Sequence, residues 1–145
     1  MNLRQLRVGE LTALAGCAAI IASLTRPWYE GPVGQLDAWD TFGPAIVLLL
    51  AAVCAGLAMV ISALTERSTA VPVATAVWCV PLSLAALIAS VVRVLERPLH
   101  TTSLCAGPWL ALIGSALLLV GAWLAMRDER PSLYPPADPE LRPPP

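Results

Sequence analysis

The sequence predicts an all-α integral membrane protein in which four transmembrane helices form an up-down-up-down bundle. Composition is the first reason: of 145 residues, 57% are hydrophobic and only 13% are charged, about half the charged share of a soluble domain. The second is grouping, because the apolar residues form four runs at about 8–24, 44–64, 70–92 and 105–126. Each run is roughly 17 to 23 residues long, and about 20 apolar residues in a helix cross the hydrocarbon core.

The first run contains one acid, Glu10, close to its start. A carboxylate in the first helical turn is favoured by the helix dipole and can reach water, so we interpret Glu10 as structural rather than as a transport site. The tetrapeptide LAGC ending at Cys17 matches a lipoprotein cleavage motif. A charged, short stretch precedes it and apolar residues follow it, which is not typical of a cleaved signal peptide. We therefore expect this run to remain as a helix.

The connection RPWYEGPVGQLDAWDTFGP at 26–44 is rich in aromatic residues and is expected to form a packed lid on the helices. Trp28 and Tyr29 follow the first run, Trp39 precedes the second, and Trp109 opens the fourth. Aromatic side chains gather at membrane–water interfaces, so these four are predicted interface anchors. The alternative is an outer surface that meets a partner protein, a cation or a lipid headgroup.

The same connection carries Glu30, Asp37 and Asp40, and Arg93 lies near the end of the third run. Asp37 is placed to cap a helix that begins at Ala38 and continues into the second run with a kink. For Arg93 two interpretations stand side by side. Its guanidinium either extends to the lipid headgroups or forms an ion pair with one of these acids or Glu96.

Matching dipeptides suggest two related helical hairpins. Gly43-Pro44 and Gly107-Pro108 open the second and fourth runs, and Arg26-Pro27 and Arg97-Pro98 end the first and third. Proline is tolerated in the first helical turn because its missing N–H would have no partner there. Duplication and chance similarity both explain the matches.

Arginine placement predicts the orientation of the helices, since cytoplasmic segments are enriched in Arg and Lys. With the N-terminus inside, the outer segments carry Arg26, Arg93 and Arg97, and the inner segments carry Arg4, Arg7, Arg67, Arg127, Arg130 and Arg142. Both termini are therefore expected in the cytoplasm of a bacterial plasma membrane. Residues 1–130 form the membrane domain, and the Pro-rich residues 131–145 are expected to be a disordered cytoplasmic tail.

The composition argues against several classes of function. A net charge of −1 without a basic patch gives no basis for nucleic-acid binding. The four cysteines fall one to a run, without the pairing of a thiol oxidoreductase, and one histidine, His100, does not make a metal site. No catalytic motif is present, so we expect no enzyme activity, cofactor or metal.

The leading hypothesis is a non-enzymatic accessory, scaffold or structural subunit that contacts the lipid bilayer and other membrane proteins or further copies of itself. The alternative is a small oligomeric transporter or channel. A transported solute would need polar groups at mid-membrane. The sequence offers only small hydroxyls for this purpose: Ser62, Thr75, Ser83, Ser90 and Ser115.

A series of short motifs resembles an uncharacterised group of small four-span membrane proteins of actinobacteria. The motifs are Arg7-Val8-Gly9-Glu10, Pro27-Trp28, Trp39-Asp40-Thr41-Phe42, Arg93, and the segment GAWLAMRDE at 121–129. The match covers about 7–130, and the chain departs from the pattern at His100-Thr101-Thr102, where no Gly-rich turn occurs. The resemblance implies a four-span fold and a taxonomic setting, and it implies no activity.

Overall fold

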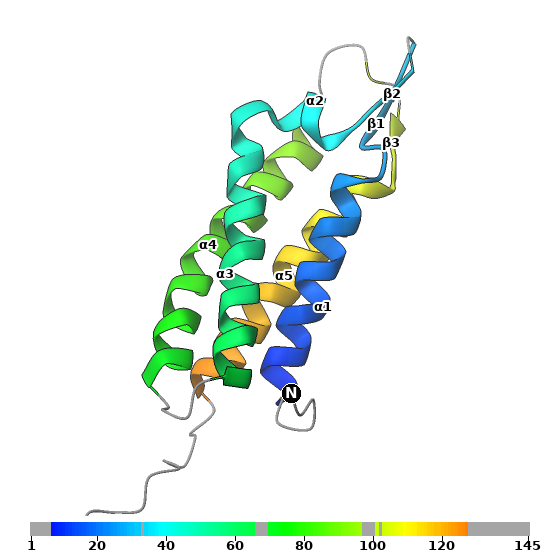
Figure 1. Ribbon diagram of the computed structural model, residues 1–145. Coiled ribbons are helices and arrows are strands. Elements are labelled where there is room, and N and C mark those ends of the chain that lie inside the picture. Colours follow the sequence, from blue (N-terminus) through cyan, green and yellow to red (C-terminus); the bar gives the residue numbers. More distant parts are fainter. Residues whose placement is uncertain (1–6, 33, 66–69, 97–100, 102, 128–145) are drawn as a thin grey trace, which may run out of the picture.

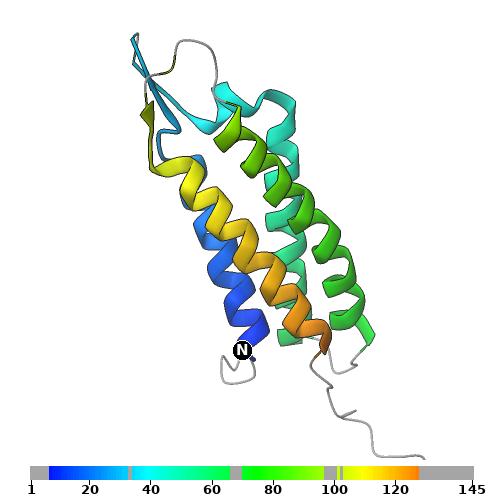
Figure 2. The ribbon, with the colours of Figure 1, turned by 180° about the vertical axis from the view of Figure 1, so that it is seen from behind.

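The computed structural model describes residues 7–32, 34–65, 70–96, 101 and 103–127. Four long helices lie side by side in it, with the chain running in alternate directions (Figure 1): α1 Val8–Leu24, α3 Ile46–Thr65, α4 Ala70–Leu95 and α5 Ala106–Arg127. They occupy the four apolar runs of the sequence. Helix α1 packs most extensively on α5, which also contacts α4, and α4 contacts α3 in turn (Figure 2). The prediction of a mainly helical chain is confirmed.

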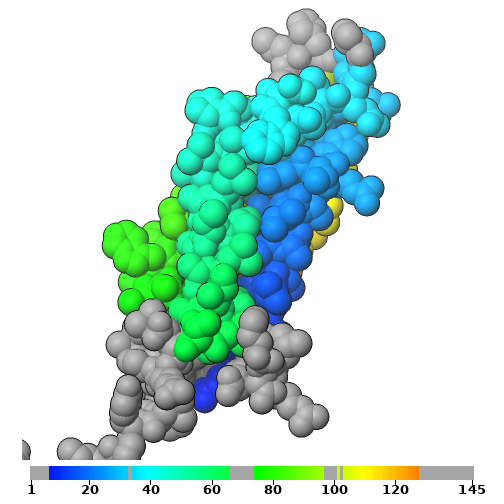
Figure 3. Space-filling model, viewed as in Figure 1, coloured from blue at the N-terminus to red at the C-terminus, as the bar shows by residue number. Residues whose placement is uncertain are grey.

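Three segments are long and apolar enough to cross a membrane: Ala38–Thr65, Ala74–Leu95 and Ala106–Arg127. Helix α1 is also apolar but has only 17 residues. Large apolar side chains remain exposed on every long helix, for example Leu11, Val47, Ile88 and Ile113, and Figure 3 shows one such face, where α3 adjoins α1. A protein surface of this kind is stable in lipid, so the chain has the features of a multi-pass membrane protein.

The all-α prediction omitted a small sheet at one end of the helices, here called the sheet end (Figure 1). Strands β1 Tyr29–Gly31, β2 Gly34–Leu36 and β3 Ser103–Leu104 pair antiparallel in the order β2-β1-β3. Tyr29 lies opposite Leu36 on one side and Leu104 on the other. Strands of two or three residues are too short to show an alternating pattern, so no periodicity indicated them.

The short helix α2, Ala38–Phe42, begins where the sequence predicts. One carboxylate oxygen of Asp37 accepts hydrogen bonds from the backbone N–H groups of Trp39 (2.8 Å) and Asp40 (3.0 Å), which confirms the predicted N-cap. The expected kink lies at Gly43, whose φ of +52° ends α2 before a 3-10 turn, η2 Gly43–Ala45, leads into α3. Residues with a side chain rarely adopt this conformation, so glycine is required here.

Glycines bring the backbones of α1 and α5 into direct contact. A Cβ atom added at Gly16 would lie 2.6 Å from the backbone nitrogen of Leu118 and 2.7 Å from the carbonyl oxygen of Gly114. The same contact recurs one heptad away, where Gly9 faces Gly121. Small residues in such positions let membrane helices pack closely.

Several sequence predictions fall outside the described residues. These are the cytoplasmic tail at 131–145, the inner turn at 66–69, and residues 97–100 with Arg97-Pro98 and His100. Five of the nine arginines used to predict the orientation also lie outside the described residues: Arg4, Arg67, Arg97, Arg130 and Arg142.

Candidate interaction site at the sheet end

Trp28 is the central side chain of the sheet end and is fully buried. Its indole Nε1–H donates a 2.8 Å hydrogen bond to the carbonyl of Ser23, in the last turn of α1. Its ring meets the ring of Phe42 edge-on, with centroids 4.6 Å apart and an interplanar angle of 88°. Trp28 therefore links the end of α1 to α2 through one polar and one apolar contact.

The backbone beside Trp28 also fixes the start of α5. The carbonyl of Trp28 accepts a hydrogen bond from the N–H of Cys105 (3.0 Å), and that of Pro27 accepts one from Gly107 (3.1 Å). These bonds satisfy N–H groups that have no partner within the first turn of a helix. A Cβ atom at Gly107 would lie 2.4 Å from the Trp28 ring, so only glycine fits beneath the indole.

Tyr29 connects β1 to the end of α4. Its side chain is fully buried, and its hydroxyl donates a hydrogen bond to the backbone carbonyl of Arg93. Burial of Trp28 and Tyr29 inside the protein differs from the lipid-facing position that an interface anchor requires. Both side chains instead bond helix ends, Trp28 at the carbonyl of Ser23 in α1 and Tyr29 at that of Arg93 in α4.

Other tryptophans occupy the exposed positions expected of anchors. Trp39 and Trp109 are 55% and 51% exposed near the sheet end. The structure adds two that the sequence interpretation missed: Trp78 on α4 and Trp123 on α5, nearer the opposite end. The Arg127 guanidinium lies 5.6 Å from the Trp123 ring centroid. Arg127, four residues after Trp123, was the sequence signal that could have indicated Trp123 as an anchor.

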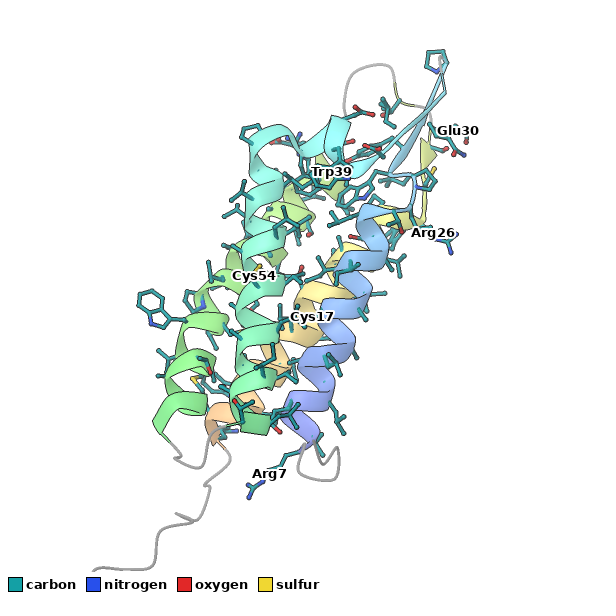
Figure 4. All side chains as sticks on the ribbon, viewed as in Figure 1. Arg7, Cys17, Arg26, Glu30, Trp39 and Cys54 are labelled. Atoms are coloured by element: carbon teal, nitrogen blue, oxygen red, sulfur yellow. The ribbon has the colours of Figure 1, made fainter. Side chains whose placement is uncertain are left out.

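The three acids of the connection do not converge on one point. Glu30 accepts a 3.0 Å hydrogen bond from the hydroxyl of Ser103 across the β1–β3 pair, and its side chain points away from the helices (Figure 4). Asp37 caps α2, and Asp40 is exposed on that helix. Glu30 therefore supports the β1–β3 pair, and Asp37 supports the start of α2.

The guanidinium of Arg93 lies over the ring of Phe42, 5.5 Å from its centroid. No carboxylate within the described part of the chain lies at ion-pair distance from it. In place of the ion pair considered from the sequence, Arg93 thus makes a cation–π contact. The side chain of Arg93 is half-buried.

Arg93 lines a groove of about 460 Å³ between α4 and the start of α3. Its lining residues are Phe42, Ala45, Leu48, Ala85, Ile88, Ala89, Val92, Arg93 and Glu96. A second hollow of about 290 Å³ lies beside the end of α1, between Arg26 and Trp39. The groove could not be found from the sequence because it joins residues 42–48 to residues 85–96, whereas the second hollow depends on how the single segment 24–39 folds.

At the opposite end of the helices, Glu10 is only 1% exposed. The expectation that its carboxylate reaches water was therefore wrong. Its carboxylate accepts a 2.8 Å hydrogen bond from the backbone N–H of Arg7, which fixes the start of α1.

The four cysteines lie in the part of the chain that the structure describes. All four are free thiols, and Figure 4 shows Cys17 and Cys54 on the neighbouring helices α1 and α3. Within the described ranges, no three His, Cys, Asp or Glu side chains gather closely enough to hold a metal ion.

Comparison with known proteins gives no relative: no protein-family model, curated protein or solved structure matches the chain. Membership of the actinobacterial group stays a prediction.

Proposed function

We propose that the chain is a four-span protein of the bacterial plasma membrane, with both termini in the cytoplasm, that acts as a non-enzymatic accessory or scaffold subunit. The bonding of its buried hydroxyls carries this proposal. Four buried serines donate to a carbonyl of their own helix three or four residues earlier: Ser23, Ser62, Ser83 and Ser90. A hydroxyl bonded in this way has used its one donor and offers a passing solute only acceptor lone pairs, which favours packing over transport.

A second hydrogen bond of Ser62 supports the same interpretation. The hydroxyls of Ser62 and Thr75 lie 3.1 Å apart and join α3 to α4, a common way of holding membrane helices together. The hydroxyl of Ser115 is buried and has no hydrogen-bond partner in the described structure. A single hydroxyl does not form a path.

Packing at two places supports a solid bundle. Backbone contact between α1 and α5 leaves no space for a side chain between these helices. At the sheet end, the buried rings of Trp28, Tyr29 and Phe42 close over the helix termini. The surfaces left for interaction are the apolar outer faces, which can meet lipid and the helices of a partner.

Purification of the tagged chain in a gentle detergent, followed by mass spectrometry, tests the proposal. We expect a different membrane protein in stoichiometric amount. A pure homo-oligomer that carries out proton-linked transport in liposomes would instead support the transporter alternative.

Labelling with a membrane-impermeant maleimide tests the orientation. In a chain whose four cysteines are replaced by alanine, Gln35→Cys places a thiol on exposed β2, and Arg127→Cys places one at the far end of α5. We expect intact cells to be labelled at position 35 and only permeabilised cells at position 127. The reverse pattern would contradict the proposed orientation.

A further inference from the structure

The groove between α3 and α4 follows one face of α4. Its lining residues on that helix are spaced by three or four positions, from Ala85 through Ala89 to Val92, and Glu96 follows the last residue of the helix. At about 1.5 Å of rise per residue, the part from Ala85 to Arg93 is about 12 Å long. Leu48 and Ala45 form the opposite wall. Three alanine side chains line the groove, and their small size creates its depth.

Polarity changes along the groove. From Ala85 to Val92 the lining is apolar, and the two charged side chains, Arg93 and Glu96, both lie at the sheet end. Arg93 is 19 positions beyond Ala74, where the membrane-crossing part of α4 begins, which corresponds to about 28 Å along the helix. The hydrocarbon core of a bilayer is about 30 Å thick. The apolar part of the groove therefore faces acyl chains, while its charged end lies at the headgroups.

Arg93 is held in place before any ligand arrives. Tyr29 bonds its backbone carbonyl, and the ring of Phe42 supports its guanidinium. Neither Arg93 nor Glu96 forms an ion pair with any residue that the structure describes, and both side chains line the groove. A planar guanidinium donates two parallel hydrogen bonds to phosphate oxygens, which makes arginine a suitable phosphate ligand.

We propose that this groove binds one phosphatidylethanolamine molecule from the leaflet at the sheet end. Charge complementarity selects this occupant. The lipid phosphate accepts hydrogen bonds from Arg93, the ammonium group pairs with Glu96, and one acyl chain lies on Leu48, Ala85 and Ala89. The inference rests on the membrane location given in the proposed function.

Native mass spectrometry tests this site in the full chain. The protein is reconstituted in bilayers of equal parts phosphatidylethanolamine and phosphatidylglycerol and then extracted in mild detergent. We expect one retained phosphatidylethanolamine per chain, and Arg93→Gln should reduce its retention by about tenfold, as for loss of a charge-assisted hydrogen bond. The matched control is Arg26→Gln, which removes an exposed arginine at the same end outside the groove and should leave retention unchanged.

A second variant separates lipid binding from folding. Ala85→Phe fills the apolar part of the groove without touching Arg93, and it should also reduce retention while thermal stability stays near that of the wild type. Equal retention in folded Arg93→Gln and wild-type protein would overturn the proposal. So would a wild-type preference for phosphatidylglycerol, or a lipid-free dimer with this groove at its interface. Failure of the membrane assignment is seen separately, as a chain that does not enter bilayers.

Discussion

The contact between α1 and α5 predicts a large effect from the addition of one methyl group, in Gly16→Ala. The new Cβ atom would lie 2.6 Å from the backbone nitrogen of Leu118 and 2.7 Å from the carbonyl oxygen of Gly114. Ordinary contacts of a Cβ atom begin near 3.4 Å. Because both obstacles are backbone atoms, no side-chain rotation relieves the overlap, and the helices must separate by about 0.8 Å.

Two opposing terms set the expected magnitude. Overpacking of a filled core costs about 1–3 kcal/mol. Alanine favours the helix over glycine by up to about 1 kcal/mol, which offsets part of this cost. We therefore expect Gly16→Ala to lower the free energy of unfolding by about 1–2 kcal/mol. Gly121→Ala meets Ala13 at 2.5 Å and should behave alike.

Unfolding by sodium dodecyl sulfate, followed by tryptophan fluorescence, measures these changes. The matched control is Ala18→Val, which adds carbon atoms to the exposed face of the same helix and should have a small effect. The double variant Gly16→Ala with Gly121→Ala should cost less than the sum of the single variants, because the first separation makes room for the second methyl group. Wild-type stability in Gly16→Ala would refute backbone contact between these helices.

Three further changes probe the sheet end and the α3–α4 pair. Trp28→Phe removes the indole hydrogen bond and should lower stability by about 1 kcal/mol in thermal unfolding, whereas Trp109→Phe, at an exposed position, should not. Asp37→Ala removes the α2 cap and should cost about 1 kcal/mol in the same assay, with exposed Asp40→Ala as the smaller-effect control. Ser62→Ala removes the hydrogen bond between α3 and α4 and should cost about 0.6 kcal/mol in detergent-induced unfolding; no loss would show that the bond is energetically neutral.

The sequence predicted the helices because the signal for an apolar helix is repeated over some twenty residues. It also predicted the cap at Asp37 and the kink before α3, since both depend on neighbouring residues. The β1–β2 pair was missed because its strands have only three residues each, and β3 was missed because no local pattern indicates that Ser103 pairs with the distant Glu30. Long helices and features set by neighbouring residues could therefore be predicted from the sequence. Very short strands and pairings between distant residues could not.

The candidate site could be predicted only in part, because it too depends on contacts between distant residues. The aromatic residues were recognised, but their burial was not, since an aromatic residue after a membrane span can lie either at the interface or beneath a folded loop. Trp28 turns inward because Gly107 leaves space for its ring, and that glycine is far away in the chain. Arg93 was recognised as a candidate because it is a charge near a helix end. Its contact with Phe42 could not be predicted, because Phe42 is placed by the change of direction at Gly43.

The lid and the groove form one coupled structure at the sheet end. Trp28 contacts the ring of Phe42, and that ring supports the guanidinium of Arg93. Tyr29 holds the carbonyl of Arg93 from the other side. A cation at a membrane surface usually moves freely on a long side chain, and here the ring of Phe42 restricts the guanidinium of Arg93. Changes in the lid that preserve the fold should therefore alter lipid retention at Arg93 before they alter membrane insertion, because insertion depends on the apolar helices and the position of the guanidinium depends on the lid.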